Sequence, residues 1–290
     1  MKNIYIINLV DWSKSFVDKN GSFFCGTSQE EKDNTAKLMQ LVDLVINTTD
    51  LHPKSAKEFT INGGLYPAHN IVLAELYDGS FVYHITDDAK FTLDNRTMSP
   101  TLTKTLEDAL KERNKGIIVP KGVYFQGGAE EEVFSPEDVK KTFGERIATP
   151  KDFLEGALDY IIAPKPYFDA TRVDSDAVLP ESKLEGVPKT NYSVYDLIKQ
   201  KYPESEYNIT FINTGVVEGI CRLHTSIGLR QMFPNARIIN ISDATTPLYG
   251  IGLGYETPQE SRDACRRVGK DIGIGYMSTE EVMNELERAA

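Results

Sequence analysis

The chain alternates short apolar runs with longer stretches in which apolar residues recur at helical spacing. The short runs, rich in Ile, Val and Leu, predict buried strands at 4–10, 44–47, 159–164, 209–213 and 236–241. Helical spacing predicts helices at about 28–45, 102–113, 218–232 and 258–268. Ser278 opens a last helix, with Glu281 three residues on as a capping box. This alternation predicts an α/β fold of three layers, with a mostly parallel sheet between helices.

The middle of the chain follows this alternation less regularly. Two runs at 81–84 and 90–93 predict a hairpin, and an apolar run at 116–125 predicts a further strand. The segment 174–189 is rich in Asp, Glu, Ser and Pro, which indicates a loop. We nevertheless expect a single domain over residues 1–290.

Composition and charge exclude several classes of protein. The 290 residues are enough for a substantial core, and the net charge of −11 comes without the basic stripe of a nucleic-acid binder. No stretch has the length of a membrane span, and the apolar start is too short for a secretory signal. The three cysteines are odd in number and widely spaced, which argues against a disulfide framework. We expect a cytoplasmic protein that acts on a small molecule and binds neither nucleic acid nor membrane.

Candidate site residues follow directly after three of the predicted strands. These are Asp11, Asp50 and the segment 215–221, which contains Cys221. Sites in parallel sheets form beyond the carboxyl ends of the strands. We therefore expect these residues to share one edge of the sheet.

A metal site is indicated by Asp50, His52 and His69. Two of the four histidines lie in this short window, and a carboxylate with two imidazoles binds a divalent transition metal. An isolated Asp-x-His is usually only a solvated turn, but the second histidine favours a catalytic metal site with open positions. Glu58 lies in the same loop, either as a fourth ligand or as a surface glutamate.

Cys221 stands where a strand, a glycine and the start of a helix meet. Backbone N–H groups at a helix start lower the pKa of a cysteine and stabilise an oxyanion, although a lone cysteine is more often a buried structural residue. His224 lies within reach, but we expect it to be an ordinary residue of the helix face. Asp11 is the preferred base, because an aromatic wall from Trp12 and Phe16 would raise its pKa; the alternative is an aspartate that caps a turn.

Taken together, these segments resemble the cysteine hydrolase superfamily that contains isochorismatases and nicotinamidases. Its first motif, Asp followed five residues later by Phe, is met by Asp11 and Phe16, although the usual Gln and Asn between them are replaced. Its metal motif, Asp-Trp-His-Pro then Trp-Pro-x-His, is matched by Asp-Leu-His-Pro at 50–53 and Tyr-Pro-Ala-His at 66–69. Its nucleophile motif, Gly-Val, four residues and Cys, is matched at 215–221.

The resemblance covers about residues 1–70 and 190–290. It implies a parallel sheet of about six strands and an Asp–Lys–Cys triad. It also implies a cis peptide between Val216 and Val217, with backbone N–H groups of Val217 and Cys221 facing the oxyanion. Between these parts the chain is longer than in ordinary nicotinamidases, so we expect an insertion at about 71–158.

The resemblance also assigns the ligands. It implies one divalent metal on Asp50, His52 and His69, with Zn expected first and Fe or Mn as alternatives. Phe16 and Trp12 are the expected substrate-binding rings.

The triad lysine has three candidates, because the family's lysine ends a strand between the metal motif and the cysteine. Lys165 follows the apolar run 159–164 and is our choice. Lys121 ends a similar run, and Lys189 precedes a Tyr-Ser pair that resembles the family's sequence.

The implied activity is hydrolysis of nicotinamide to nicotinate and ammonia through a cysteine thioester, as in NAD salvage. The first alternative is another small-amide hydrolase of the same superfamily, and a catalytically inactive binding protein is favoured less. The sequence leaves a homo-oligomer open.

Overall fold

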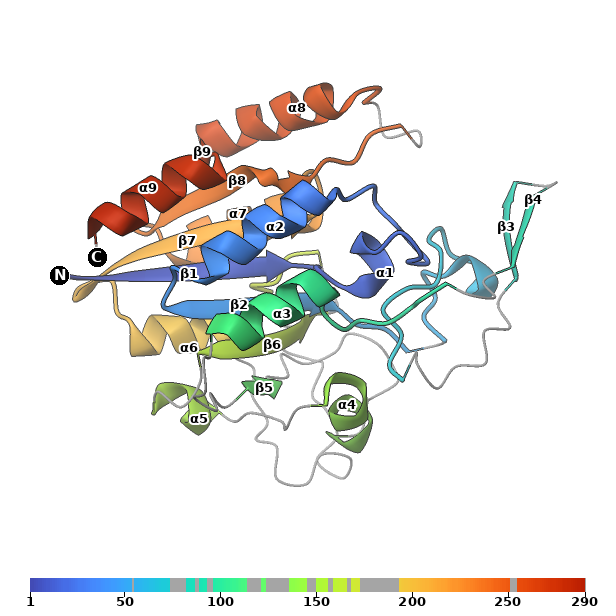
Figure 1. Cartoon of the computed structure of the whole chain (residues 1–290), viewed down its shortest axis with the longest axis horizontal. Helices are drawn as coiled ribbons and strands as arrows, with labels where there is room; N and C mark the ends of the chain where they lie inside the picture. Colours follow the sequence, from blue (N-terminus) through green and yellow to red (C-terminus); the bar gives the residue numbers. More distant parts are fainter. Residues whose placement is uncertain are drawn as a thin grey trace.

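The computed structural model describes residues 1–53, 55–73, 82–86, 89–92, 96–113, 121–123, 136–144, 150–155, 159–165, 168–172, 193–250 and 255–289. Within them a seven-stranded sheet has the order β5-β6-β2-β1-β7-β8-β9, with every neighbouring pair parallel (Figure 1). The strands are β1 (Lys2–Val10), β2 (Leu44–Asp50), β5 (Lys121–Val123), β6 (Tyr160–Lys165), β7 (Tyr207–Val216), β8 (Arg237–Thr246) and β9 (Gly275–Met277).

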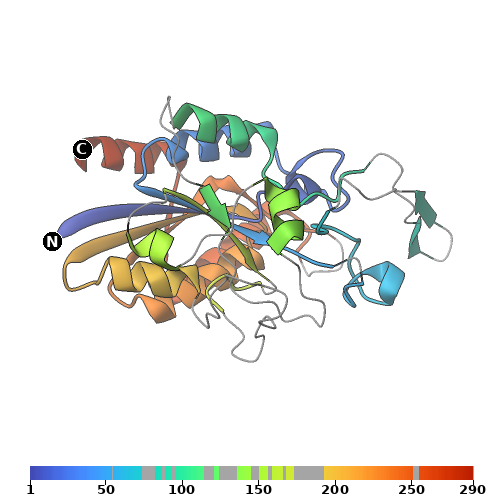
Figure 2. The same ribbon diagram turned by 90° about the horizontal axis from the view of Figure 1, so that it is seen from below.

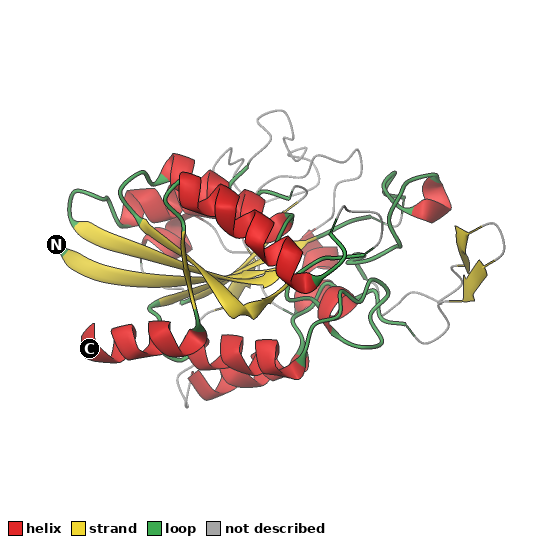
Figure 3. Ribbon diagram, turned by 90° about the horizontal axis from the view of Figure 1, so that it is seen from above, coloured by secondary structure: helices red, strands yellow, loops and turns green. Residues whose placement is uncertain are grey.

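Helices cover both faces of this sheet, which gives the three predicted layers (Figure 3). One apolar core lies under α2 (Gln29–Met39), α3 (Lys104–Arg113) and α9 (Thr279–Ala289). The other core lies under α5 (Pro150–Leu154), α6 (Val194–Lys201) and α7 (Cys221–Met232). The remaining elements are α8 (Pro258–Asp271), which contacts α7 and β9, and the short α1 (Lys14–Val17), η1 (Thr60–Asn62) and α4 (Pro136–Phe143).

The predicted strands and helices occur in the expected order, and the differences have local causes. The first long helix ends at Met39 rather than near 45, because the apolar residues after it belong to β2. The helix α6 was not predicted; Ser193 and Asp196 form its capping box. The edge strand β9 was also missed, since three residues carry too little pattern, and it brings the sheet to seven strands instead of about six.

The central segment contributes to the main fold. The expected hairpin is present as β3 (Val82–Thr86) and β4 (Ala89–Thr92), which Figure 2 shows standing away from the sheet. In contrast, α3 buries its apolar residues in the main core, and β5 pairs with β6. The expected insertion at 71–158 therefore includes two segments that belong to the three-layer fold. The loop expected at 174–189 lies outside the described residues.

A row of asparagine side chains crosses the middle of the sheet. Asn8 donates to Asn213 at 2.6 Å, and Asn213 donates to Asn240 at 3.2 Å. Tyr195 of α6 donates to Asn8 at 3.0 Å. All four residues are buried, and the three strands are therefore tied by side chains as well as by their backbones.

The carboxyl ends of the strands lie at one end of the molecule, opposite the two chain termini (Figure 1). The loop that carries η1 lies beyond this edge. In the part of the chain that the structure describes, no helix combines the length and the apolar character that crossing a membrane requires.

Candidate catalytic and metal-binding site

The ends of four strands meet at this edge. Val10, the last residue of β1, is in register with Gly215 of β7, and Asp50 of β2 is in register with Lys165 of β6. Gly215 has a φ of 119°, and a Cβ there would collide with the Val10 carbonyl oxygen. Only glycine therefore lets β7 approach β1 this closely, which places the turn before Cys221 beside Asp11.

Asp11 and Lys165 form a buried ion pair. The Lys165 Nζ donates to Asp11 Oδ2 at 2.8 Å, and each side chain is only 1% exposed. The other oxygen, Asp11 Oδ1, accepts the backbone N–H of Asp50 at 2.7 Å. The expected position of Lys165 is thus found. Lys121 is paired with Tyr160, at the opposite end of β6.

The third candidate lysine, Lys189, lies outside the described residues.

The charges of this pair depend on burial and on neighbouring groups. Burial raises the pKa of Asp11 above its ordinary value, more than the Lys165 ammonium lowers it. Burial alone would lower the pKa of Lys165, but Asp11, Cys221 and Asp50 raise it to well above the ordinary value. Lys165 is therefore a permanent cation, and Asp11 is a carboxylate that takes up a proton more readily than usual.

Cys221 is the first residue of α7, so its backbone N–H has no acceptor within the helix. The peptide between Val216 and Val217 is cis, as the resemblance implies. The expectation of a lowered thiol pKa is wrong. Burial raises the pKa of Cys221 well above the ordinary value, and Asp11 and Asp50 add to this, while Lys165 opposes it. The resting side chain is therefore a neutral thiol near Asp11, and it needs a base to become a nucleophile.

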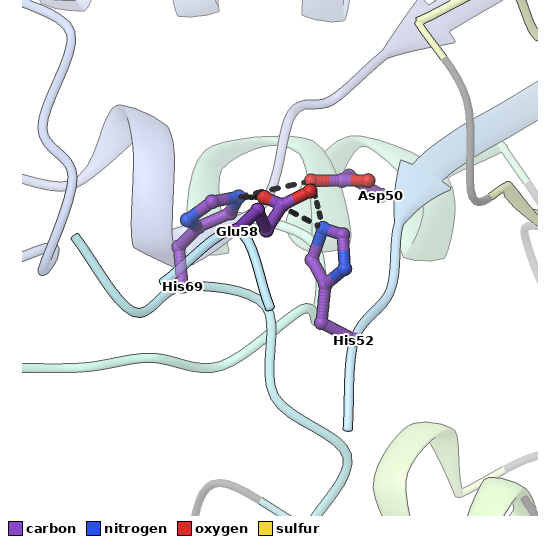
Figure 4. A group of neighbouring side chains, drawn as sticks. All are labelled: Asp50, His52, Glu58 and His69. Atoms are coloured by element: carbon purple, nitrogen blue, oxygen red, sulfur yellow. Dashed lines mark hydrogen bonds and ion pairs between the residues drawn. The ribbon is translucent and has the colours of Figure 1, made fainter. Parts of the chain in front are cut away.

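Four side chains form a second group beside this pair. Asp50, His52, Glu58 and His69 each direct one ligand atom to a common point, and these atoms lie within 4.8 Å of one another (Figure 4). Asp50 Oδ2 is 2.8 Å from His52 Nε2 and 3.1 Å from His69 Nε2. Glu58 Oε1 is 3.4 Å from each of the same two nitrogens. The expected ligands are thus brought together, with Glu58 among them. We call these four residues the Asp/His/Glu cluster.

The donor set fits a divalent cation. The Nδ1 of His69 lies 2.6 Å from the Pro67 carbonyl, which can only accept, so Nδ1 carries the proton and Nε2 offers a lone pair. That lone pair faces carboxylate oxygens, which are also acceptors, so a cation or a proton must lie between the nitrogen and the oxygens. Burial alone would raise the pKa of Asp50, but His52 and His69, when a proton lies between them and this carboxylate, and the Lys165 ammonium hold that pKa well below its ordinary value. The cluster therefore presents negative charge and imidazole nitrogens together.

Aromatic rings line one side of the Asp/His/Glu cluster. The ring of Phe16 lies 5.0 Å from that of His69, and the ring of Phe23 lies 5.2 Å from it and 6.0 Å from that of Tyr66. Trp12, the other expected substrate ring, is completely buried in the core, where its indole N–H donates to Thr214 at 3.0 Å. Of the two expected rings, Phe16 is the one beside the cluster.

Two features of the site were not predicted. Phe23 carries no motif, and the only signal was an apolar pair after Gly21. Glu218 and Arg222 form a buried ion pair around the Cys221 turn, and their spacing of four residues on a helix was the available signal. His224 is exposed on α7, as expected, with its ring 6.0 Å from that of Phe168.

Comparison with known proteins finds similarity in structure alone. No family model matches the sequence, and no curated protein matches it. The PnC1 protein of L. infantum, solved in complex with nicotinate, superposes with a TM-score of 0.52 at 11% identity, over 97% of this chain and 96% of that one. A nicotinamidase/pyrazinamidase of Bacillus subtilis gives 0.51 at 16% identity, over 96% of this chain and 100% of that one.

A third similar structure is an isochorismatase-like hydrolase of Alkaliphilus metalliredigens, with a TM-score of 0.50 at 12% identity, over 97% of this chain and 98% of that one. The structural similarity extends over nearly the whole of this chain and of each of these proteins. The chain therefore has the fold of the nicotinamidases and isochorismatase-like hydrolases.

Proposed function

We propose that this protein is a cysteine amidohydrolase that converts nicotinamide to nicotinate and ammonia. The observation that carries the proposal is the buried Asp11–Lys165 pair beside the Cys221 thiol, joined through Asp50 to the Asp/His/Glu cluster. The proposed nucleophile (Cys221), the proposed base (Asp11) and the Lys165 ammonium group thus lie next to a cluster that suits a metal ion. The shared fold supports the proposal, and NAD salvage is the setting in which the reaction would operate.

The first half of the reaction forms a thioester. Asp11 takes the proton of the Cys221 thiol, and the sulfur attacks the amide carbon. Lys165 stabilises the thiolate, since its charge lowers the pKa of Cys221. Backbone N–H groups of Val217 and Cys221 are the proposed donors to the oxyanion. Asp11 then returns its proton to the amide nitrogen, the C–N bond breaks, and ammonia leaves.

The second half hydrolyses the thioester. Water gives a proton to Asp11 and attacks the acyl carbon, the C–S bond breaks, and the sulfur regains the proton. The raised pKa of Asp11 suits both directions of transfer, because a base with a pKa nearer the working pH accepts and returns protons more readily.

Asp50, His52, His69 and Glu58 are the proposed holders of one divalent ion, with Zn as the first candidate and Fe or Mn as alternatives. When bound, that ion would supply a Lewis-acidic site for the ring nitrogen of the substrate. Phe16 supplies an apolar wall beside His69 against which a flat ring can lie. We also propose that residues 71–158, apart from α3 and β5, form an insertion into this fold.

The test is a direct assay of ammonia release from a small panel of amides, with protein loaded separately with Zn, Fe and Mn. Nicotinamide and benzamide are a matched pair, because they differ only in the ring nitrogen. We expect nicotinamide to be hydrolysed and benzamide to be a much poorer substrate. Equal turnover of the two would favour a different small-amide hydrolase, and no ammonia from any amide would contradict the proposal.

A further inference from the structure

The turn between β7 and α7 determines where the Cys221 sulfur lies. It spans residues 217–220, and four backbone hydrogen bonds hold it. The Glu218 N–H donates to the Thr246 carbonyl at 2.9 Å, which ties the turn to the end of β8, and the Ile220 N–H donates to the Val217 carbonyl at 3.1 Å. The Arg222 N–H also donates to the Val217 carbonyl at 3.4 Å and the His224 N–H to the Ile220 carbonyl at 2.9 Å, so backbone bonds join the loop to the first turn of α7, and side-chain contacts add to them.

Glu218 and Arg222 supply such a contact, one on each side of Cys221. Arg222 Nη2 lies 3.0 Å from Glu218 Oε1 and 3.4 Å from the Glu218 carbonyl oxygen. The two side chains are 0% and 1% exposed. The Arg222 guanidinium therefore contacts both the side chain and the backbone of Glu218 in the turn. Arg222 is itself the residue next to Cys221.

Tyr276 and the helix α8 pack against this ion pair and the turn. The Arg222 guanidinium lies 5.6 Å from the ring centre of Tyr276, whose hydroxyl donates to the Cys265 carbonyl of α8 at 2.8 Å. The Cys265 sulfur lies 3.5 Å from where a Cβ on Gly219 would be, so α8 packs directly on the turn. Arg222 thus has little room to move away from Glu218.

Stability does not explain why a charged pair occupies this place. Removing two charges from water costs so much that well-packed apolar residues are often as stable or more stable. Within the described part of the chain, Glu218 Oε2, Arg222 Nε and Arg222 Nη1 have no hydrogen-bond partner, so the pair is not fully compensated. Its distinguishing property is its position around the nucleophile.

We propose that the Glu218–Arg222 ion pair is a positioning element that fixes the 217–221 turn, and with it the Cys221 sulfur and the backbone N–H groups of Val217 and Cys221. The pair does not touch the reacting atoms. It acts through the turn, because its two members bracket the nucleophile along the chain and hold each other at one distance. This inference rests on the proposed role of Cys221 as nucleophile.

The test replaces the pair by apolar residues, Glu218→Leu together with Arg222→Met. We expect the double variant to unfold cooperatively at a temperature no lower than the parent, with KM little changed and kcat reduced on the order of 100-fold. A double variant that keeps kcat within twofold of the parent overturns the proposal. If it does not fold, the isosteric Glu218→Gln takes its place, with the same split between kcat and KM expected and an unchanged kcat as the overturning result.

A second measurement is independent of any substrate. The rate at which iodoacetamide alkylates Cys221 is followed against pH, with peptide mapping to separate Cys221 from Cys25 and Cys265. We expect the Cys221 profile to change in both variants and to stay unchanged in Asp108→Asn, which removes an exposed pair of the same spacing with Lys104. An unchanged profile in the Glu218 variants overturns the inference. A changed profile in a protein that hydrolyses no amide would refute the proposed function alone.

Discussion

The proposed catalytic group (Asp11, Lys165 and Cys221) and the Asp/His/Glu cluster lie at the same sheet edge but are held differently. Asp11, Lys165 and Cys221 each come directly from a strand end or a helix start, and the Asp11–Lys165 pair is sealed from solvent. In the cluster only Asp50 ends a strand; the other three side chains lie on the loop after β2, and the Glu58 side chain is 33% exposed. The ends of regular elements position the first group, whereas three of the four cluster side chains lie on a loop, which the proposed metal ion would hold together. The two groups are therefore separable by mutation.

The largest expected effect is that of Cys221→Ala. Amide hydrolysis should be abolished, because no other group can form the thioester, while the fold and the metal content should stay those of the parent. Ammonia release, mass spectrometry for a covalent adduct and elemental analysis measure the three quantities. Substantial residual turnover would remove Cys221 as the nucleophile and with it the separation of the two groups.

Lys165→Met should be the most destabilising of the changes considered. It leaves the Asp11 carboxyl buried without its partner, which typically costs about 3–5 kcal/mol of unfolding free energy. Denaturant unfolding measures this, and activity should fall as well. Lys104→Met is the matched control: its lysine also pairs with an aspartate but is 79% exposed, so little or no change in the unfolding free energy is expected. Similar losses in both variants would contradict a special role for burial.

His52→Ala should impair the Asp/His/Glu cluster and leave the group of Asp11, Lys165 and Cys221 largely unchanged. We expect loss of the bound divalent metal and of hydrolysis, with the pH profile of Cys221 alkylation largely retained. In the parent, metal at about 100 times its Kd should raise the unfolding free energy by about 2.7 kcal/mol, and the variant should lack this gain. Elemental analysis and thermal unfolding with and without added metal measure both effects. Equal metal content in parent and variant would refute the assigned ligands.

At neutral pH the smallest expected effect is that of Cys25, which lies outside both groups and whose contribution to stability changes only in alkaline solution. Burial raises the pKa of Cys25 to about 12 from an ordinary 9.0. Above pH 9 the unfolded chain releases this proton and the folded chain keeps it, so stability is present below pH 9 and declines as the pH rises toward 12, by at most about 1.4 kcal/mol per pH unit. Cys25→Ala should show a shallower decline in denaturant unfolding above pH 9. Parallel curves for parent and variant would show that Cys25 does not titrate in this range.

Sequence reasoning identified the parts of the site that lie in short local patterns. Asp11, Asp50 and Cys221 follow apolar strands directly, and the two histidines lie within one loop, so strand ends and spacing were enough to bring them together. The choice among three lysines needed the pairing of distant strands: register with Asp50 puts Lys165 at the carboxyl edge, while Lys121 begins its strand.

What the sequence could not supply depends on tertiary burial. The thiol pKa of Cys221 was predicted in the wrong direction, because a helix start favours the thiolate locally while burial and the two carboxylates oppose it. The core position of Trp12 depends on Thr214, some two hundred residues away. Among the elements, α6 and β9 were missed because their helix and strand patterns are short.

The asparagine row in the middle of the sheet bears on how accurately the site is assembled. Strands that present uniform aliphatic faces can slide past one another with little loss of packing, and each step of one residue moves a strand by about 3.3 Å. A slip of β7 against β1 would break the Asn8–Asn213 hydrogen bond and leave the Asn8 amide donor and the Asn213 amide oxygen without this partner in the interior. The same slip would move Cys221, which follows β7, relative to Asp11, which follows β1. The amide row thus disfavours misaligned sheets in which Cys221 and Asp11 would lie apart.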